Sequence, residues 1–325
     1  MTYSTPSLGF EATYRFSSQL ANIQDIIDNE DDDIIRSIVL SQHFEKNCNK
    51  ANLTLFDLSD LHIDDCNVEI KTHIVLAKER KRLLNQFTKL NKMVSNYQLV
   101  PSIISHNNNL EGGGHIHLGY TKHAEQYEMS NGKKMEFVGN MLLNLNNIIN
   151  TYPSLLWAMN SPYDNINANS SLLNPKFKKG VDYLKLSYND TRLGDMMRVS
   201  CTGVSSKNYA IIFRFVYSTF EFRFFTMPKD ADGLKLNIDV AESLYKIAFE
   251  HSKSKKIIKP RYTEKKQLMN MTVNEAVRNL KDCAKYLGID YNEFVKHDRV
   301  KALRKRFQLE RIHNPNKLLK ETYLN

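Results

Sequence analysis

Two histidines that are two residues apart, His115 and His117, follow three consecutive glycines in the segment EGGGHIHLG at residues 111–119. Side chains two apart on a strand point to the same face of a sheet, so the two imidazoles would project together. Glycines such as Gly113 and Gly114 let the backbone pass close to a ligand, because they carry no Cβ that would clash with it. This pattern suits a metal ion or a phosphate group, although a pair of surface histidines after a flexible loop would look the same.

A second segment, FEFRFFTM at residues 220–227, combines an acid with an arginine. On a strand, Glu221 and Arg223 would share one face, and the phenylalanines at 220, 222 and 224 would share the other. The two charged groups form either a simple ion pair, which contributes little when exposed, or a metal ligand beside a phosphate clamp. Because the apolar face indicates a well-packed strand, we expect the polar face to line a cleft.

Two further acids, Glu11 in GFEATYRF and Glu69 in NVEIKT, lie within strand-like runs, where carboxylates are uncommon. A position at a sheet edge or toward solvent would also explain them. Four strands that each present one or two oxygen or imidazole ligands would form a site for a hard divalent cation such as Mg²⁺ or Mn²⁺. The four cysteines form no CxxC pair, which argues against structural zinc and favours a reducing compartment.

The elements that must position these residues alternate between strands and helices. Strand-like runs are predicted at 8–16, 67–76, 97–104, 114–120, 209–217 and 219–227. Helical spacing is predicted at 78–94, 134–160 with a break near Pro153, about 239–251, 272–287 and 298–312. Several strands follow one another without a crossover helix, so we expect an α+β fold with a mostly antiparallel sheet flanked by helices.

Charge divides the chain into two parts. Of its 325 residues, 42% are hydrophobic and 25% charged, which permits a buried core. The net charge is +9, and residues 251–325 alone hold 19 Lys and Arg against 8 Asp and Glu. We therefore predict a main α+β domain at 1–252 and a basic helical C-terminal lobe at 253–325. Within this lobe, residues 299–311 form either a solvated, docked helix or a surface for nucleic acid or another polyanion.

The sequence favours a cytoplasmic protein without a membrane partner. Its first residues, MTYSTPSLGF, lack the basic-then-apolar layout of a signal peptide, and no run of eighteen residues is apolar enough to span a bilayer. The many Asn and Lys residues hint at an AT-rich bacterial or viral genome, in which case the location would be the host cytoplasm.

The order of these motifs along residues 8–228 resembles the glutamine-synthetase-like carboxylate–amine ligase superfamily. The nearest pattern is that of the amidoligase and glutamate–cysteine-ligase-like group, which includes phage-encoded members. The run YPSLLWAMNSPY at 152–163 is similar to the helix and loop that follow the His motif in that group. The run RLGDMMR at 192–198 resembles the Arg-containing loop before the Glu-x-Arg strand.

The resemblance implies a curved antiparallel sheet that forms an open funnel, with ATP entering at one side and divalent metals held by the sheet. It implies that the metal ligands are Glu11, Glu69, His115 and Glu221. The residues that would contact the nucleotide are His117, Gly113 and Gly114. It further implies that Arg223 neutralises the transferring phosphoryl group, and that Arg192 or Arg198 holds the substrate carboxylate or the phosphates.

The implied chemistry is phosphorylation of a carboxylate by ATP, after which an amine displaces the phosphate. The substrates would be a small-molecule or peptide carboxylate and an amine. One departure is Thr13, which occupies the position of a second glutamate in the family's first strand. Two other functions remain open: a metal-dependent hydrolase with His115 and His117 on zinc, and a non-catalytic relative that binds nucleic acid.

Overall fold

The computed structural model describes residues 6–16, 56–64, 67–72, 74–95, 99–101, 114–119, 132–159, 196–198, 211–214, 219–225, 227–261 and 273–296. Its strands are β1 (Ser7–Phe16), β2 (Phe56–Asp64), β3 (Asn67–Thr72), β4 (Val75–Leu76), β5 (Leu99–Pro101), β6 (His115–Gly119), β7 (Met196–Arg198), β8 (Ile211–Arg214) and β9 (Thr219–Phe222). Its helices are the short 3₁₀ turn η1 (Ala77–Glu79) and the α-helices α3 (Arg80–Ser95), α4 (Gly132–Thr151), α5 (Ser154–Met159), α8 (Ala231–Lys253), α10 (Val273–Leu287) and α11 (Tyr291–Lys296).

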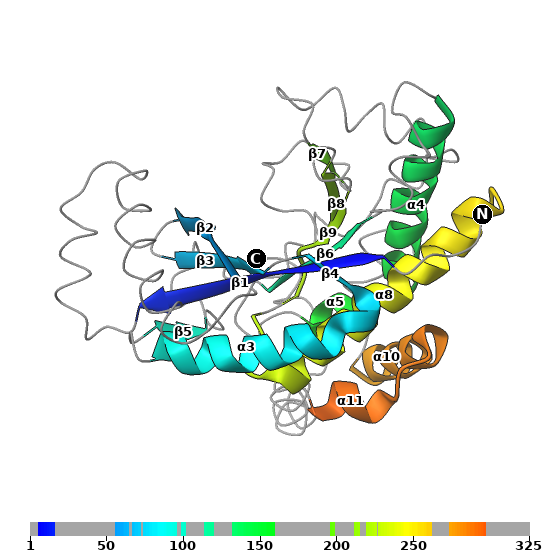
Figure 1. Ribbon diagram of the computed structural model, residues 1–325. Helices are drawn as coiled ribbons and strands as arrows, with labels where there is room; N and C mark the ends of the chain where they lie inside the picture. Colours follow the sequence, from blue (N-terminus) through cyan, green and yellow to red (C-terminus); the bar gives the residue numbers. More distant parts are fainter. Residues whose placement is uncertain are drawn as a thin grey trace.

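The strands form one sheet in the order β2-β3-β1-β6-β9-β8-β7, and β4 and β5 also pair with β1. Every pairing among the described strands is antiparallel. Helices α3 and α8 lie along one side of the sheet (Figure 1). The predicted α+β class with an antiparallel sheet is therefore confirmed, whereas the funnel shape and the basic helical lobe remain predictions.

The two faces of the central strands differ because their residues alternate. On β1, the side chains that pack toward the helices are fully or almost fully buried: Leu8, Phe10, Ala12 and Tyr14. Phe10 packs edge-on against Phe87 of α3 with ring centroids 5.4 Å apart, and the Tyr14 hydroxyl donates a hydrogen bond to Oδ1 of Asn91 at 2.7 Å. The residues between them, including Glu11, belong to the opposite, polar face.

The same alternation continues on β6 and β9. Ile116, Leu118, Phe220 and Phe222 are completely buried, and Phe220 packs against Tyr245 of α8 with ring centroids 5.8 Å apart. On α3, the buried residues are Leu83, Phe87 and Leu90, the spacing of one helix face. The core thus lies between the sheet and the helices, and the polar face is left for the site.

Several predicted elements occur close to their expected positions. These are the strands near 8–16 and 114–120, the helices near 78–94 and 272–287, and the helical segment 134–160 with its break at Pro153. The predicted strand 67–76 is divided into β3 and β4, and α8 begins eight residues before the expected Asp239. The predicted helix 298–312 and the basic segment 299–311 lie outside the described residues.

The early start of α8 has a local cause. Asp230 has an extended backbone, and its Oδ1 accepts a hydrogen bond from the backbone N–H of Gly233 at 2.8 Å. This is an N-cap, which satisfies one of the free N–H groups of the first helical turn. Within the part of the chain that the structure describes, no helix is both long and apolar enough to cross a membrane.

Candidate active site

The four strands that carry the predicted metal ligands are neighbours in the sheet, in the order β3, β1, β6, β9. In the antiparallel register, Glu11 on β1 lies opposite His115 on β6, and His117 on β6 lies opposite Glu221 on β9. Directly opposed residues share a face of the sheet. The fold therefore brings four residues from distant parts of the sequence to one place on the polar face.

The four side chains form a chain of polar contacts. Nδ1 of His115 lies 3.3 Å from Oε1 of Glu11 and 3.3 Å from Oε1 of Glu221, and Nε2 of His117 lies 3.5 Å from Oε2 of Glu11. The Glu221 side chain is completely buried and that of Glu11 is 7% exposed, whereas 12% of His115 and 19% of His117 are exposed. The imidazoles are thus the more accessible members of the group.

A fifth side chain, Arg223, joins this group. Its Nη1 lies 3.4 Å from Oε1 of Glu221, the same oxygen that His115 approaches. The side chain is 19% exposed, so a cation stands beside the buried carboxylate and still reaches the surface of the site. We call these five residues the sheet cluster: Glu11, His115, His117, Glu221 and Arg223.

The placement of Arg223 corrects one sequence prediction. The expected strand 219–227 ends at Phe222, so Arg223 lies just beyond β9 instead of within it. The N–H of Gly114 donates to the carbonyl of Phe225 at 3.0 Å, although the regular register would place residue 224 opposite Gly114. One extra residue on this side interrupts the ladder in the manner of a β-bulge.

The electrostatics of the site favour an ionised Glu11. Burial raises the pKa of this carboxyl because it loses its hydration. The hydrogen bonds and charges of His115 and His117 act in the opposite direction and outweigh burial, so the pKa of Glu11 lies well below its ordinary value. Each oxygen of the carboxylate has its own imidazole partner, and the site keeps a buried negative charge.

The donor set fits a hard divalent cation in kind. The contacts of 3.3–3.5 Å are close to the roughly 3 Å that separates neighbouring donors around one Mg²⁺ ion. Among the residues that the structure describes, no group of three or more His, Cys, Asp or Glu is arranged to hold a metal ion. Mg²⁺ in nucleotide sites is commonly held by one or two carboxylates together with phosphates and waters, so a complete protein cage is not required.

The remaining predicted residues are placed only in part. Glu69 on β3 lies opposite Thr13, two residues along β1 from Glu11. Gly114 is buried and directly precedes β6, and Arg198 lies on β7. Gly113 and Arg192 lie outside the described residues. The register thus places Glu69 near the sheet cluster, and the roles of all five residues remain predictions.

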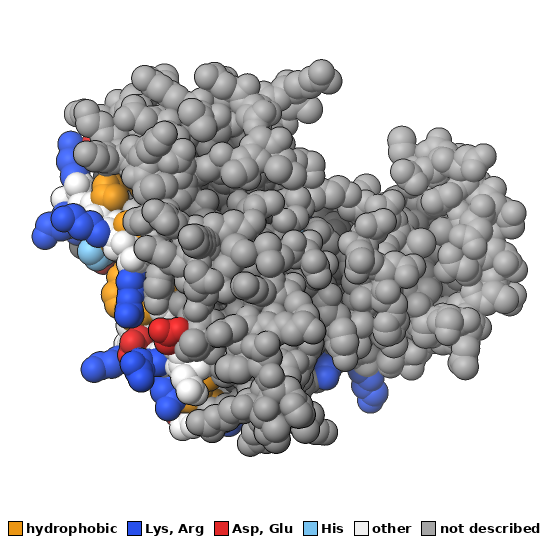
Figure 2. All heavy atoms as spheres, turned by 180° about the vertical axis from the view of Figure 1, so that it is seen from behind, with side chains coloured by type: hydrophobic (Ala, Val, Ile, Leu, Met, Phe, Trp, Pro, Cys, Tyr) orange, Lys and Arg blue, Asp and Glu red, His pale blue; other side chains and the backbone are white. Residues whose placement is uncertain are grey.

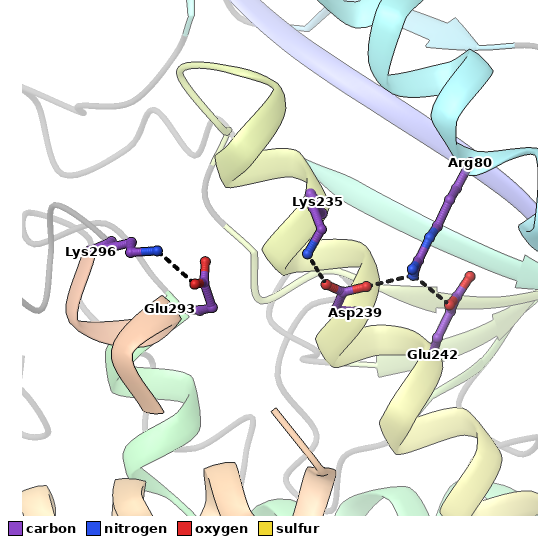
Figure 3. A network of polar contacts seen from close by, with 6 residues as sticks. All are labelled: Arg80, Lys235, Asp239, Glu242, Glu293 and Lys296. Atoms are coloured by element: carbon purple, nitrogen blue, oxygen red, sulfur yellow. Dashed lines mark hydrogen bonds and ion pairs between the residues drawn. The ribbon is translucent and has the colours of Figure 1, made fainter. Parts of the chain in front are cut away.

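A second charged group, which the sequence analysis missed, lies on the helix side (Figure 3). Nη1 of Arg80 on α3 lies 2.6 Å from Oδ1 of Asp239 and 3.5 Å from Oε2 of Glu242, both on α8. Nζ of Lys235 lies 2.8 Å from Oδ2 of Asp239. These four residues, which we call the helix cluster, line a cavity of about 810 Å³. No sequence signal connects α3 with α8, because the partners are 159 and 162 positions apart.

Comparisons with known proteins identify the fold. No protein-family model and no curated protein match the sequence. The ligand-free structure of GmaS aligns over 95% of this chain and 72% of its own, with 13% sequence identity and a TM-score of 0.50. An ADP complex of GmaS and a novel glutamine synthase homologue cover 95% and 98% of this chain and 73% and 71% of their own, at 12% and 10% identity and a TM-score of 0.45 each. The chain has a glutamine-synthetase-like fold, as the order of its motifs predicts.

Proposed function

We propose that this protein is an ATP-dependent carboxylate–amine ligase that forms an amide or isopeptide bond. The observation that carries the proposal is the sheet cluster, in which two carboxylates, two imidazoles and a guanidinium from β1, β6 and the end of β9 contact one another on the polar face. The glutamine-synthetase-like fold supports it, since the order of motifs that predicts this fold also implies ligase chemistry.

The proposed reaction has two steps. A carboxylate oxygen of the acid attacks the γ-phosphorus of ATP, and ADP leaves. The amine nitrogen then attacks the acyl carbon, phosphate leaves, and the nitrogen loses a proton. Phosphoryl transfer requires positioning and charge neutralisation more than a covalent nucleophile. The sheet cluster matches this requirement, because it supplies charged and imidazole groups and contains no Ser or Cys.

Each member of the sheet cluster has a proposed role. Arg223 binds the oxygens of the transferring phosphoryl group with its planar guanidinium, and Glu221 orients Arg223 through the 3.4 Å contact. His117, the most exposed imidazole, faces the nucleotide phosphates together with the Gly113–Gly114 backbone. Arg192 or Arg198 holds the substrate carboxylate.

The residues that would hold Mg²⁺ or Mn²⁺ are Glu11, His115 and Glu221, with Glu69 added on the basis of its register. When bound, the cation would neutralise phosphate charge that Arg223 alone cannot balance. Glu11 supports this role because its carboxyl stays ionised at neutral pH despite its burial.

A thermal-shift titration with ATP and MgCl₂ or MnCl₂ tests the proposal. A ligand that binds only the native state raises the free energy of unfolding by about 2.7 kcal/mol at a hundredfold excess over its Kd. We expect a metal-dependent rise in Tm that is lost in Glu221→Gln. The matched control is Glu242→Gln, which neutralises a glutamate of the helix cluster and should keep the full rise.

Three outcomes would contradict the proposal. The absence of any change in Tm with ATP and either metal would show that the protein has no nucleotide site. A rise that is equal in Glu221→Gln and in the control would separate nucleotide binding from the sheet cluster. A zinc-dependent hydrolysis that needs no nucleotide would favour the hydrolase instead.

A further inference from the structure

Helices α8 and α10 end with the same hydrogen-bond pattern, but only α10 has a glycine at the position where glycine is the usual residue. After α8, the N–H of Lys255 donates to the carbonyl of Ser252 at 3.0 Å, and the N–H of Lys256 donates to that of His251 at 2.8 Å. After α10, Gly288 and the next residue make the same two bonds, at 3.2 and 2.9 Å. Both ends are Schellman motifs, in which one residue adopts the left-handed conformation.

That left-handed residue is glycine in one motif and lysine in the other. Gly288 has φ +69° and Lys255 has φ +54°, and Lys255 is the only residue other than glycine with positive φ in the part of the chain that the structure describes. A Cβ makes this conformation costly, so glycine is the usual choice there. A side chain kept against a local backbone preference points to a use for that side chain.

The segment that continues from Lys255 is held firmly against α4. The buried Asn144 donates through Nδ2 to the carbonyl of Lys256 at 3.0 Å, and its Oδ1 accepts from the N–H of Ile258 at 2.8 Å. Nδ2 of Asn147 donates to the carbonyl of Ile258 at 2.7 Å. Because these bonds use only the backbone of the segment, its side chains are free to vary in type. Residues 253–261, which we call the basic strap, thus form a fixed surface element.

The exposed side chains of the basic strap are almost all cationic. The segment has the sequence KSKKIIKPR and contains no acid. All its cations are exposed: Lys253, Lys255, Lys256, Lys259 and Arg261. Figure 2 shows Lys and Arg side chains at several places along the described edge of this face, and the largest group of acidic side chains lies in its lower part. A fixed row of like charges attracts a polyanion.

An exposed aromatic ring lies at the far end of the basic strap. The N–H of Arg261 donates to Oγ1 of Thr151 at 3.2 Å, and Arg261 is within electrostatic reach of the Tyr152 hydroxyl. The Tyr152 ring lies 5.1 Å from that of Tyr286 on α10. Tyr286 is 37% exposed, one of two large hydrophobic residues that are exposed among those described. Asp282 places a negative charge within electrostatic reach of the same hydroxyl.

We propose that the basic strap and Tyr286 together bind single-stranded nucleic acid. Proteins that bind single strands combine a row of cations along the phosphates with an aromatic ring on which a base stacks. A duplex keeps its bases stacked on one another and would leave the ring without a partner. This site is separate from the sheet cluster, and it does not depend on the proposed ligase activity.

Fluorescence anisotropy of the full chain with a labelled oligothymidine of about 20 nucleotides tests the charge requirement. The test variant is the triple charge reversal Lys255→Glu, Lys256→Glu and Lys259→Glu. Its matched control reverses three exposed cations of α3: Lys81→Glu, Arg82→Glu and Lys89→Glu. We expect the strap variant to lose at least about tenfold in affinity, and the slope of log Kd against log salt to fall by about 2. The control should lose less than about threefold.

Two single substitutions separate stacking and charge from folding. Tyr286→Ala should weaken binding about tenfold, whereas Tyr286→Phe should retain it, because phenylalanine keeps the ring. Lys255→Gly should raise Tm by about 2 °C, since glycine relieves the backbone, and should still weaken binding. A residue with only a structural role would not give gains in stability together with losses in affinity.

Three results would overturn this proposal. They are equal losses in the strap and α3 triple variants, equal affinity for a duplex of the same sequence, and full competition by poly-glutamate at matched charge. The first would show that binding depends only on the net charge of the protein. The second would show that binding does not require a base to stack on Tyr286. The third would replace nucleic acid by acidic proteins in general.

Discussion

The sheet cluster and the helix cluster both hold partly or fully buried carboxylates, yet their pKa values are shifted in opposite directions. The pKa of Glu11 is lowered and that of Glu242 is raised. Burial raises the pKa of Glu11, but His115 and His117 outweigh it and bring the pKa well below its ordinary value. Burial raises the pKa of Glu242, the charge of Arg80 lowers it and that of Asp239 raises it, so that the pKa lies at about 7. The side chain of Glu242 is the more exposed of the two, at 22% against 7%.

The number of partners explains the difference better than the depth of burial. Each oxygen of Glu11 has its own imidazole within 3.5 Å. Arg80 lies 2.6 Å from Asp239 but 3.5 Å from Glu242, so its charge interacts more strongly with Asp239 than with Glu242. Oε1 of Glu242 is buried and accepts no hydrogen bond from the residues that the structure describes. Under the proposed function, the sheet cluster holds its charges for a ligand, whereas the helix cluster joins α3 to α8.

The largest expected difference between the clusters is in turnover. Arg223→Lys should lower ATP-dependent phosphate release by about a hundredfold or more, because a point charge cannot replace the planar fork on a phosphoryl group. ATP affinity should change by less than about threefold, since the positive charge remains. Phosphate release with a panel of carboxylic acids and amines measures the first quantity, and thermal shift measures the second.

The matched control for this prediction is Arg80→Lys in the helix cluster. It makes the same substitution at an arginine that also contacts a carboxylate, and we expect turnover to stay within about twofold of the parent. Normal turnover in Arg223→Lys would contradict the proposal that Arg223 binds the transferring phosphoryl group. Equal losses in both variants would instead indicate a general effect on the fold.

The residues of the sheet cluster could be predicted because the two faces of a strand appear in the sequence as alternating residue types. In GFEATYRF, apolar residues alternate with others, and the structure buries Phe10, Ala12 and Tyr14 on one face while Glu11 belongs to the other. The register that sets Glu11 opposite His115 is not visible in the sequence, since it depends on which strands become neighbours. The order of family motifs supplied that information.

Other features could not be foreseen for local reasons. The edge strand β2 has the sequence FDLSDLHID, which is rich in residues that strands disfavour, and its register shifts between Asp57 and His62. Asp230 and Gly233 look like a turn, and only the cap hydrogen bond makes them the start of α8. The helix cluster joins residues that no spacing rule connects.

The next difference is in the pH dependence of stability. Glu242 has a raised pKa in the folded state, so folding favours its protonated form. Its contribution is present below the unfolded pKa of roughly 4.3 and is lost as pH rises through about 7. We therefore expect Glu242→Gln to be more stable than the parent at pH 8, by on the order of 2 kcal/mol, and nearly equal to it at pH 4.

Urea denaturation at several pH values checks this expectation. The control is Glu250→Gln, an exposed position on the same helix, which should follow the parent at every pH. A constant difference between Glu242→Gln and the parent from pH 4 to pH 8 would show that the carboxyl does not titrate in this range. In that case the contrast between the two clusters would disappear.

The smallest effect belongs to the start of α8, the helix that carries Asp239 and Glu242 and follows the sheet cluster in the chain. Asp230→Ala removes the acceptor of the 2.8 Å bond from Gly233 and should cost about 1 kcal/mol of stability. Asp230→Asn keeps an oxygen in place and should cost much less. Neither variant should change the Tm rise with ATP and metal, because the sheet cluster is formed by β1, β6 and the end of β9. If Asp230→Ala lost that rise while it stayed folded, the helix layer would be part of the ligand site, and the division of roles between the two clusters would have to be abandoned.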